Sequence, residues 1–298
     1  MYSKKLILGG AQLGNKYGIY SKTSKMKNLN ELKKIFKFSA KNELEFIDTA
    51  QDYKNSEKII GQLSKNKFKI ISKINLDPKL SSKDLELIIF RKINISLRKL
   101  KIKKIDILLL HNFDRFINNE NYLSKIYKVL VKLKNNGIIL KVGISSYYPE
   151  KIHKLFKIFK FDVVQVPLNI FDQRLLYSKI YNLKSFKNIE IHVRSVFLQG
   201  ILLKKKYPTY FDKWEKKIKV YVDFLQKNNI DPIHFCLSFV LGVKKVRKVI
   251  IGVQNLYQLK EILKKSKKKI KYKRKIFKRF IIKDDKLIIP RYWKINNV

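Results

Sequence analysis

The chain has 298 residues, 45% of them hydrophobic and 12% aromatic, which excludes a disordered composition and supplies enough apolar side chains for a large core. A single cysteine, Cys236, excludes an internal disulfide framework and fits a reducing compartment. The four histidines lack the spacing of a zinc site, so we expect no metal. No apolar run reaches the ~20 residues of a membrane span, so we expect no membrane partner. The N-terminus lacks the pattern of a signal peptide, so we expect a cytoplasmic location.

The formal net charge of +45 would attract nucleic acid, anionic lipid or acidic metabolites. Lysine greatly outnumbers arginine, however, and asparagine and isoleucine are also abundant, which is typical of a coding bias spread over the whole surface. A nucleic-acid module should instead gather arginine and aromatic residues on one face. We therefore expect no specific nucleic-acid partner, and we interpret the basic run Lys264–Arg279 as a solvated helix face and loop.

Short β-like runs alternate with longer amphipathic, helix-like stretches along the chain. The predicted strands are Leu6–Leu8, Glu45–Ile47, Phe68–Ile71, Ile105–Leu110, Ile138–Val142, Asp162–Val166, Ile189–Val193 and Val249–Ile251. The predicted helices include Leu29–Lys41, Ser56–Leu63, Ser82–Leu100, Tyr122–Asn135, Pro149–Phe156, Trp214–Lys227 and an extra one at Pro232–Gly242. Eight alternations without a linker predict α/β architecture as a single (β/α)8 TIM barrel over residues 1–298, with 267–298 as a basic C-terminal loop and tail.

Nearly every predicted strand ends in polar or glycine residues that a core does not need. These residues are Gly9–Gln12, Asp48–Thr49, Ser72–Lys73, His111–Asn112, Ser145–Ser146, Gln165, Arg194–Ser195 and Gly252. In a closed parallel barrel all of them converge on the C-terminal rim, where barrel enzymes build their sites. We therefore expect the active site at that rim.

Four residues near that rim make a coherent proton-transfer set. Tyr53 is a poor acid at its usual pKa near 10, and a nearby Lys73 ammonium would lower that pKa. Asp48 would pair with Lys73, and His111 would donate a hydrogen bond to a carbonyl oxygen. Such a set protonates and polarises a C=O group, while the hydride must come from a nicotinamide or flavin cofactor.

Each of the four residues also has an ordinary structural interpretation. Asp48 could cap a turn, Tyr53 could be an amphipathic surface residue, and Lys73 could face solvent. His111 could be a satisfied core histidine. Cys236 lies in an apolar helix-like run and is interpreted as inert packing, and no Gly-x-Gly-x-x-Gly fingerprint of a Rossmann domain is present.

Ten short sequence motifs occur along the chain, and their order carries more information than any one of them. They are Leu8–Gly14, Phe46–Ala50, Tyr53–Glu57, Ile60–Gly61, Ile71–Lys73, Asp106–His111, Val142–Ser146, Val164–Asn169, Arg194–Gly200 and Ile250–Asn255. Together they resemble the aldo-keto reductase family over about residues 5–265. The resemblance implies carbonyl reduction with Tyr53 as the acid, Lys73, Asp48 and His111 as its partners, and NAD(P)H bound without a Rossmann domain. His111 favours C=O over C=C reduction, because the family carries glutamate there when it reduces C=C.

The resemblance also assigns the cofactor-binding residues. They are Gln12, Ser145, Ser146, Gln165, Arg194, Ser195, Phe197, Gly252, Gln254 and Gln258. Three positions depart from the family pattern. Ser146 replaces a common asparagine, Lys54 replaces a glycine, and Arg194 stands where an aromatic often stacks on the nicotinamide. The expected cofactor is NADPH, with NADH left open because the usual basic residues for the 2′-phosphate do not follow the eighth predicted strand.

Three functions stay open at this point. The first is reduction of a small-molecule aldehyde or ketone, including a sugar-type carbonyl, by a monomer or weak homo-oligomer. The second is a catalytically weak nicotinamide-binding regulatory protein on the same barrel, and the third is a basic surface that recruits polyanions. Substrate identity cannot be read from the sequence, although Tyr292 and Trp293 are candidates for pocket walls or for packing on the barrel.

Overall fold

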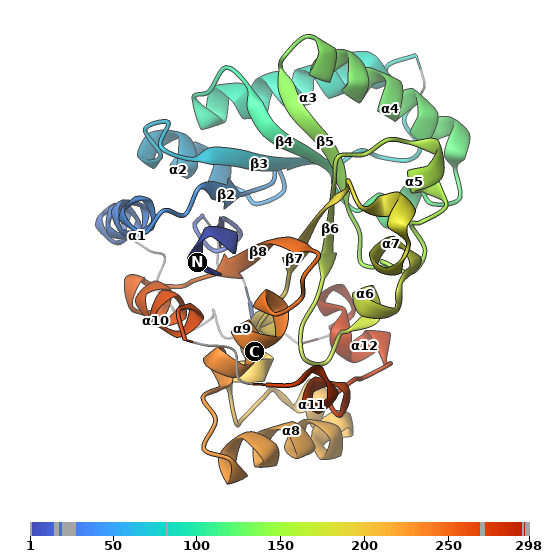
Figure 1. The fold of residues 1–298 in the computed structure, drawn as a ribbon. Coiled ribbons are helices and arrows are strands. Elements are labelled where there is room, and N and C mark those ends of the chain that lie inside the picture. The colour runs from blue at the N-terminus through green and yellow to red at the C-terminus, as the bar shows by residue number, and fades with distance from the viewer. Residues whose placement is uncertain are drawn as a thin grey trace.

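The computed structural model describes residues 2–14, 18–19, 28–81, 83–268, 272–293 and 295. Within those ranges eight parallel strands close into one barrel in sequence order, and helices surround it (Figure 1). The strands are β1 (Leu6–Gly9), β2 (Phe46–Asp48), β3 (Lys69–Ile74), β4 (Ile105–Leu110), β5 (Ile139–Ser145), β6 (Val163–Pro167), β7 (Glu190–Arg194) and β8 (Val246–Gly252). The predicted (β/α)8 fold is confirmed.

Helices of two kinds precede, connect and follow the strands. The α-helices are α1 (Leu29–Lys41), α2 (Ser56–Leu63), α3 (Leu85–Leu100), α4 (Glu120–Asn135), α5 (Leu155–Ile158), α6 (Arg174–Tyr177), α7 (Lys179–Asn182), α8 (Glu215–Lys227), α9 (Pro232–Leu241), α10 (Leu256–Ser266), α11 (Arg274–Lys278) and α12 (Asp285–Ile288). The 3-10 helices are η1 (Tyr2–Lys5), η2 (Phe113–Phe116), η3 (Lys184–Phe186), η4 (Leu198–Leu203), η5 (Thr209–Trp214) and η6 (Pro290–Tyr292).

Successive side chains of each strand point alternately into the barrel and toward the surrounding helices, so the apolar residues form two layers. One small cluster fills the inside of the barrel and consists of Ile7, Ile71, Ile107, Leu109, Val163 and Ile250. The alternate strand positions, such as Leu6, Leu8, Leu108 and Val164, belong to the larger core between strands and helices. The same alternation therefore turns Asp48, Lys73 and Gln165 toward the barrel axis.

Helix caps explain several boundaries that the sequence predicted. The Asn28 side chain accepts a hydrogen bond from Glu31 N at 2.8 Å and starts α1, and Asn255 accepts from Gln258 N at 2.9 Å and starts α10. Asp231 caps α9 by accepting from His234 N, and Pro232 occupies the first turn, where its missing N–H costs nothing. These caps fix the residues at which the three helices around the barrel begin.

Two predicted helices differ from the structure. The segment Pro149–Phe156 forms successive turns, and only Leu155–Ile158 is helical. The chain turns at the start of this segment because Tyr148 N donates to the Ser146 hydroxyl and Lys151 N donates to Tyr148 O. The helix predicted from Ser82 begins at Leu85, and Ser82 itself lies outside the described residues.

The C-terminal segment, expected as a basic loop and tail, contains α11, α12 and η6 where it is described. It is anchored by hydrogen bonds from Gln173 Nε2 to Phe277 O and from Ile282 N to Phe171 O. Trp293 packs edge-on against Phe211 with ring centroids 4.9 Å apart, so it is a packing residue. Residues 269–271, 294 and 296–298 of this segment lie outside the described residues.

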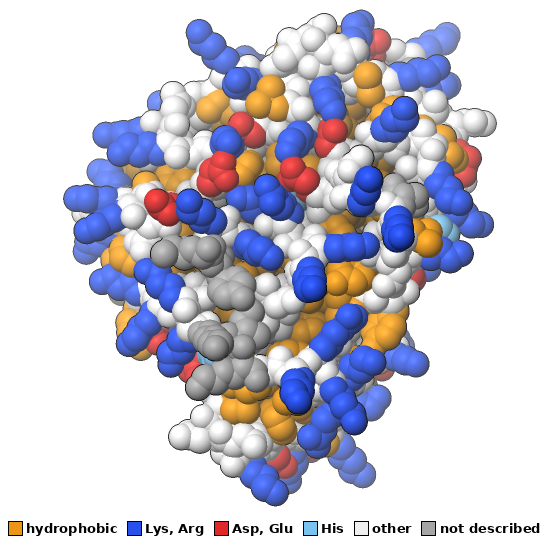
Figure 2. All heavy atoms as spheres, viewed as in Figure 1, with side chains coloured by type: hydrophobic (Ala, Val, Ile, Leu, Met, Phe, Trp, Pro, Cys, Tyr) orange, Lys and Arg blue, Asp and Glu red, His pale blue; other side chains and the backbone are white. Residues whose placement is uncertain are grey.

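Basic side chains cover the visible face of the molecule, with few acidic ones among them (Figure 2). No helix in the described ranges is long and apolar enough to cross a bilayer.

Candidate functional site

A buried ion pair lies at the C-terminal ends of two neighbouring strands. Lys73 on β3 donates from Nζ to Asp48 Oδ2 at 2.7 Å and to Thr49 O at 2.7 Å. Asp48 ends β2, and its second oxygen, Oδ1, accepts from Gln165 Nε2 on β6 at 2.7 Å. Lys73 and Asp48 are only 1% and 4% exposed. Three of the predicted site residues therefore form one buried network across the barrel.

Tyr53 lies directly above this pair. It follows β2 in a turn closed by a hydrogen bond from Tyr53 N to Ala50 O, and Lys73 Nζ is 5.0 Å from the centre of its ring. The rings of Tyr53 and His111 meet edge to face at 6.1 Å. The structure thus brings all four predicted catalytic residues together. No hydrogen bond joins the Tyr53 hydroxyl to Lys73 or to His111 among the described residues.

Asp52 is a partner of His111 that the sequence interpretation missed. Its Oδ2 lies 3.0 Å from His111 Nδ1. The pKa of Asp52 is lowered, first by this hydrogen bond, so its carboxylate can only accept and Nδ1 carries the proton. In neutral His111 the other nitrogen, Nε2, is then an acceptor, and it becomes a donor only when the ring is protonated.

Burial dominates the electrostatics of the three titratable neighbours. It lowers the pKa of Lys73 although Asp48 acts in the opposite sense, and it lowers the pKa of His111 against the hydrogen bond to Asp52. The pKa of Tyr53 is raised by burial and then by the Asp48 charge. The net shift is thus opposite to the lowering expected from a nearby ammonium, because burial and then the Asp48 carboxylate both favour the neutral phenol.

One of the two predicted amide contacts at the end of β5, Ser146, is already engaged within the protein. Ser145 is buried and lies opposite Gln165 in the β5–β6 register. The Ser146 hydroxyl donates to Asp114 Oδ1 and accepts from Tyr148 N at 3.0 Å. Asp114 also accepts from Tyr147 N, so it fixes the loop after β5. Ser146 therefore serves first to hold this loop.

Arg194 ends β7 and reaches across the rim. Its guanidinium lies 4.0 Å from the centre of the Tyr147 ring and donates to Ser146 O at 3.4 Å and to Ser195 Oγ at 3.5 Å. Its charge lowers the pKa of both Tyr53 and His111 as a lesser influence, which places it close to the proton-transfer set. The stack on Tyr147 fixes the plane of the Arg194 guanidinium.

The remaining predicted cofactor residues fall into separate groups. Gln12 and Gly252 touch across β1 and β8, since a Cβ on Gly252 would lie 2.6 Å from Gln12 Oε1. Gln254 N donates to Gln258 Oε1 at 2.8 Å at the start of α10. Ser195 O accepts from Asn169 Nδ2, while Phe197 is almost completely buried in the core. No hydrogen bond or ion pair of the described residues joins the Gln254–Gln258 pair to the catalytic set.

One orphaned atom fits a nicotinamide. Gln165 is fully buried, its Nε2 is held by Asp48, and its Oε1 has no hydrogen-bond partner among the described residues. A buried acceptor without a donor is costly, and a carboxamide NH2 group would satisfy it. The described residues contain no group of three or more His, Cys, Asp or Glu arranged to hold a metal ion.

Both missed carboxylates carried a weak signal in the sequence. Asp52 immediately precedes Tyr53, and Asp114 lies three residues after His111, each in a loop that leaves the C-terminal end of a strand. Their pairing depends on distances between separate loops, which the spacing along the chain does not give.

Comparison with solved structures gives the same fold. An aldo-keto reductase of Bacillus halodurans, solved in its holo form, superposes with a TM-score of 0.72 at 17% identity, covering 93% of this chain and 90% of its own. A Pseudomonas aeruginosa protein named as an aldo-keto reductase superposes with a TM-score of 0.64 at 19% identity, covering 88% and 89%. No curated protein sequence matches the chain.

A family model settles the relationship. The model described as the aldo/keto reductase family matches residues 5–279, which is nearly the whole barrel and all of the site residues named above. The chain therefore belongs to the aldo-keto reductase family of NAD(P)H-dependent oxidoreductases.

Proposed function

We propose that this protein reduces an aldehyde or ketone to an alcohol with Tyr53 as the general acid. The observation that carries the proposal is the Lys73 ammonium, held under the Tyr53 ring by Asp48 at 2.7 Å and removed from solvent. A buried cation next to a phenol stabilises the phenolate that remains after the proton has left. A solvated lysine could not do this as strongly, because water would screen its charge.

The residues act in a simple order. A bound nicotinamide would supply the hydride to the carbonyl carbon. Tyr53 holds its proton at neutral pH and delivers it to the carbonyl oxygen as negative charge develops there. Burial raises the pKa of Tyr53, so this transfer depends on a cation that stabilises the phenolate. Lys73 then stabilises the phenolate, and Asp48 keeps the ammonium in place. A protonated His111 donates from Nε2 to the same oxygen.

The decisive experiment compares the protein with Tyr53→Phe on a panel of aldehydes with NADPH. We expect kcat to fall by about 10²–10⁴, the usual contribution of a positioned acid. The matched control is Tyr127→Phe, which changes a tyrosine on α4 whose hydroxyl only donates to Lys160 O at 3.3 Å. Equal turnover by Tyr53→Phe and the parent protein would remove Tyr53 from this role.

We propose NADPH as the cofactor, held at its carboxamide by Gln165 Oε1 and Ser145. The support is the orphaned acceptor of Gln165 and the basic character of the whole surface. Titration followed by nicotinamide fluorescence should give tighter binding of NADPH than of NADH. Gln165→Leu should weaken both cofactors about tenfold, the value of one hydrogen bond. Unchanged affinity in Gln165→Leu would place the carboxamide elsewhere.

A nicotinamide-binding regulatory protein is the second candidate. It is favoured by the absence of a hydrogen bond from the Tyr53 hydroxyl to Lys73 or His111 among the described residues. Hydrogen bonds of this kind are often long in enzymes without ligand and tighten on binding. Tight binding of NADPH with no turnover of any carbonyl would select this candidate over the reductase.

For the substrate we propose a carbonyl compound that also carries negative charge, as phosphorylated or acidic sugars do. Arg194 and Arg291 both lie over the Tyr147 ring, at 4.0 and 4.8 Å from its centre. Arg291 is only partly neutralised by Asp114, whose Oδ2 is 3.7 Å away. Arg291→Gln should raise the KM of a carboxylate-bearing aldehyde about tenfold and leave that of a neutral aldehyde unchanged. An equal rise for both aldehydes would contradict this proposal.

A further inference from the structure

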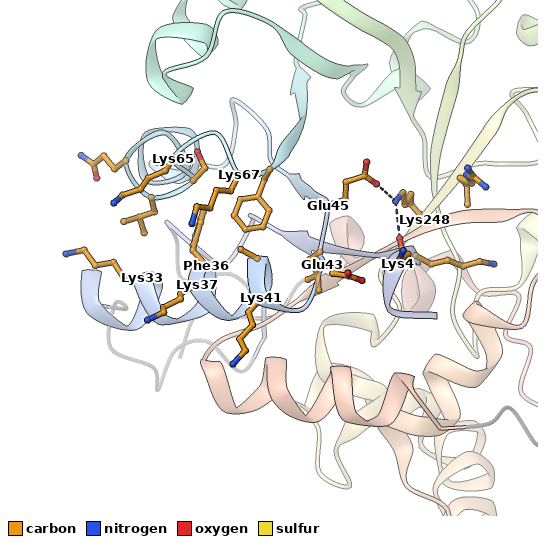
Figure 3. Close-up of a pocket in the computed structure, with 18 residues that line it drawn as sticks. Lys4, Lys33, Phe36, Lys37, Lys41, Glu43, Glu45, Lys65, Lys67 and Lys248 are labelled. Carbon is orange, nitrogen blue, oxygen red and sulfur yellow. Dashed lines mark hydrogen bonds and ion pairs between the residues drawn. The ribbon is translucent and has the colours of Figure 1, made fainter. Parts of the chain in front are cut away.

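The opposite end of the barrel carries a feature that carbonyl reduction does not explain. A groove of about 1560 Å³ opens at the N-terminal rim, between α1 and the turn that follows α2 (Figure 3). Its walls are formed by residues that precede β1, β2 and β3 and by the start of β8. In barrel enzymes the reaction site lies at the other rim. This groove is therefore separate from the site around Tyr53.

Positive charge is concentrated in this groove beyond the general excess of the chain. Nine of its 18 lining residues are Lys or Arg, compared with 68 of 298 in the whole sequence. The nine residues are Lys4, Lys5, Lys33, Lys37, Lys41, Lys65, Lys67, Arg247 and Lys248. Only two carboxylates, Glu43 and Glu45, line it with them.

The carboxylates in the groove neutralise few of these cations. Glu45 is already shared between Lys69, at 2.6 Å, and Lys248, at 3.1 Å. Figure 3 shows the second of these pairs. Within the described residues, no ion pair engages the lysines of α1 or of the turn after α2. Lys5 is half-buried near Arg247, and burial followed by this like charge lowers its pKa. An anion in the groove would relieve repulsion that the protein alone leaves in place.

The cations are arranged along the groove in rows. Lys33, Lys37 and Lys41 recur every fourth residue on α1, so they follow one helix face with steps of about 6 Å. Lys65 and Lys67 stand on the opposite wall, in the turn between α2 and β3 (Figure 3). Two facing rows of ammonium groups suit an elongated anion with charge repeated along its length.

The chemistry of the lining restricts what that anion can be. Eight of the nine cations are lysines, which act as point charges and do not form the bidentate contacts of arginine. The two aromatic residues, Phe36 and Phe68, are buried and packed edge-on against each other at 5.9 Å. The groove therefore offers no platform on which nucleobases could stack. A flat membrane surface would not reach into a recessed groove.

We propose that this groove binds a flexible polyphosphate chain through its phosphate groups alone. The lysines of α1 hold one side of the chain, and those of the turn after α2 hold the other. Binding is independent of nicotinamide and of carbonyl reduction, because no residue of the catalytic set lines the groove.

The test measures binding of fluorescently labelled inorganic polyphosphate to the full chain at about 0.15 M salt, where surface charges act only over about 8 Å. One variant combines Lys33→Gln, Lys37→Gln and Lys41→Gln. The matched control removes the same charge from α8, with Lys216→Gln, Lys219→Gln and Lys227→Gln, three exposed lysines that do not line the groove. Circular dichroism and carbonyl reductase activity should be unchanged in both variants.

We expect the α1 variant to bind polyphosphate at least about tenfold more weakly, and the slope of log Kd against log salt to fall by about 2, from three lost contacts of a single-stranded polyanion. The α8 control should change affinity by less than about twofold. Equal weakening in both variants would show that only the net charge of the protein matters, and it would overturn the groove as the binding site. The absence of binding by the parent protein, or tighter binding of single-stranded RNA or polyglutamate than of polyphosphate, would overturn the ligand.

Discussion

The two ends of this barrel treat charge in opposite ways. At the C-terminal rim the charged groups are paired: the buried Lys73 with the buried Asp48, and the partly buried Arg174 with the buried Asp172 at 2.9 Å. His111 there is hydrogen-bonded to the exposed carboxylate of Asp52. At the N-terminal rim most groove cations are exposed and face one another. The difference is one of precision. Buried pairs hold single atoms in fixed positions, as proton transfer requires, whereas two rows of exposed lysines supply an extended positive field that suits an elongated anion.

The largest effect should come from breaking the buried pair. Asp48→Asn leaves the Lys73 ammonium without its counter-charge, so we expect a loss of about 3–5 kcal/mol in the free energy of unfolding by urea, together with loss of turnover. Lys41→Gln at the other rim should change the unfolding free energy by less than about 0.5 kcal/mol. If Asp48→Asn is as stable as Lys41→Gln, the distinction between the two rims fails.

The pH dependence of that variant sharpens the same point. Burial lowers the pKa of Lys73 below that of the unfolded chain, so the unfolded state binds more protons between the two pKa values. Stability contributed by this residue therefore rises as the pH is raised toward 10.5. The rise should be steeper in Asp48→Asn, because the charge that favoured the ammonium is gone. Urea midpoints measured at several pH values test this prediction, and a midpoint that falls as the pH is raised toward 10.5 would contradict it.

A smaller effect should follow from the His111–Asp52 pair. Because the pKa of His111 is lowered, its Nε2 becomes a donor only as the pH falls below about 6.5. We expect kcat/KM to increase on that side of the profile. Asp52→Asn removes the carboxylate that favours the protonated ring, so kcat/KM near pH 6 should fall by roughly threefold to tenfold. Asp114→Asn, which does not touch His111, should keep the parental shape of the profile; a profile that Asp52→Asn leaves unchanged would remove Asp52 from this role.

The smallest effect should come from relieving repulsion at the N-terminal rim. Lys5→Gln removes a half-buried charge beside Arg247 and should raise the unfolding free energy by a few tenths of a kcal/mol. The gain should shrink at high salt and also toward pH 10.5, where the parent loses this charge. A decrease in stability at low salt would mean that Lys5 is satisfied by a contact other than solvent.

Particular residues show how much of the candidate site could be predicted from the sequence. Asp48 and Arg194 end strands, and Lys73 and Gln165 lie near the C-terminal ends of theirs, so the sequence could place all four at one rim of a parallel barrel. Phe197, predicted to contact the cofactor, packs largely into the core, and Ser146 is hydrogen-bonded to Asp114, so both assignments stay predictions. Asp52 and Asp114 were missed because their partners lie 59 and 32 residues away in the chain.

The sequence by itself determined the eightfold alternation, the rim at which the proposed catalytic residues gather and the family. These follow from the two-residue period of strands and from short motifs, which are local properties. Only the tertiary structure decided the protonation chemistry and the basic groove. A pKa depends on burial and on neighbours brought in from other strands, and a groove depends on how α1 and the turn after α2 pack against the barrel.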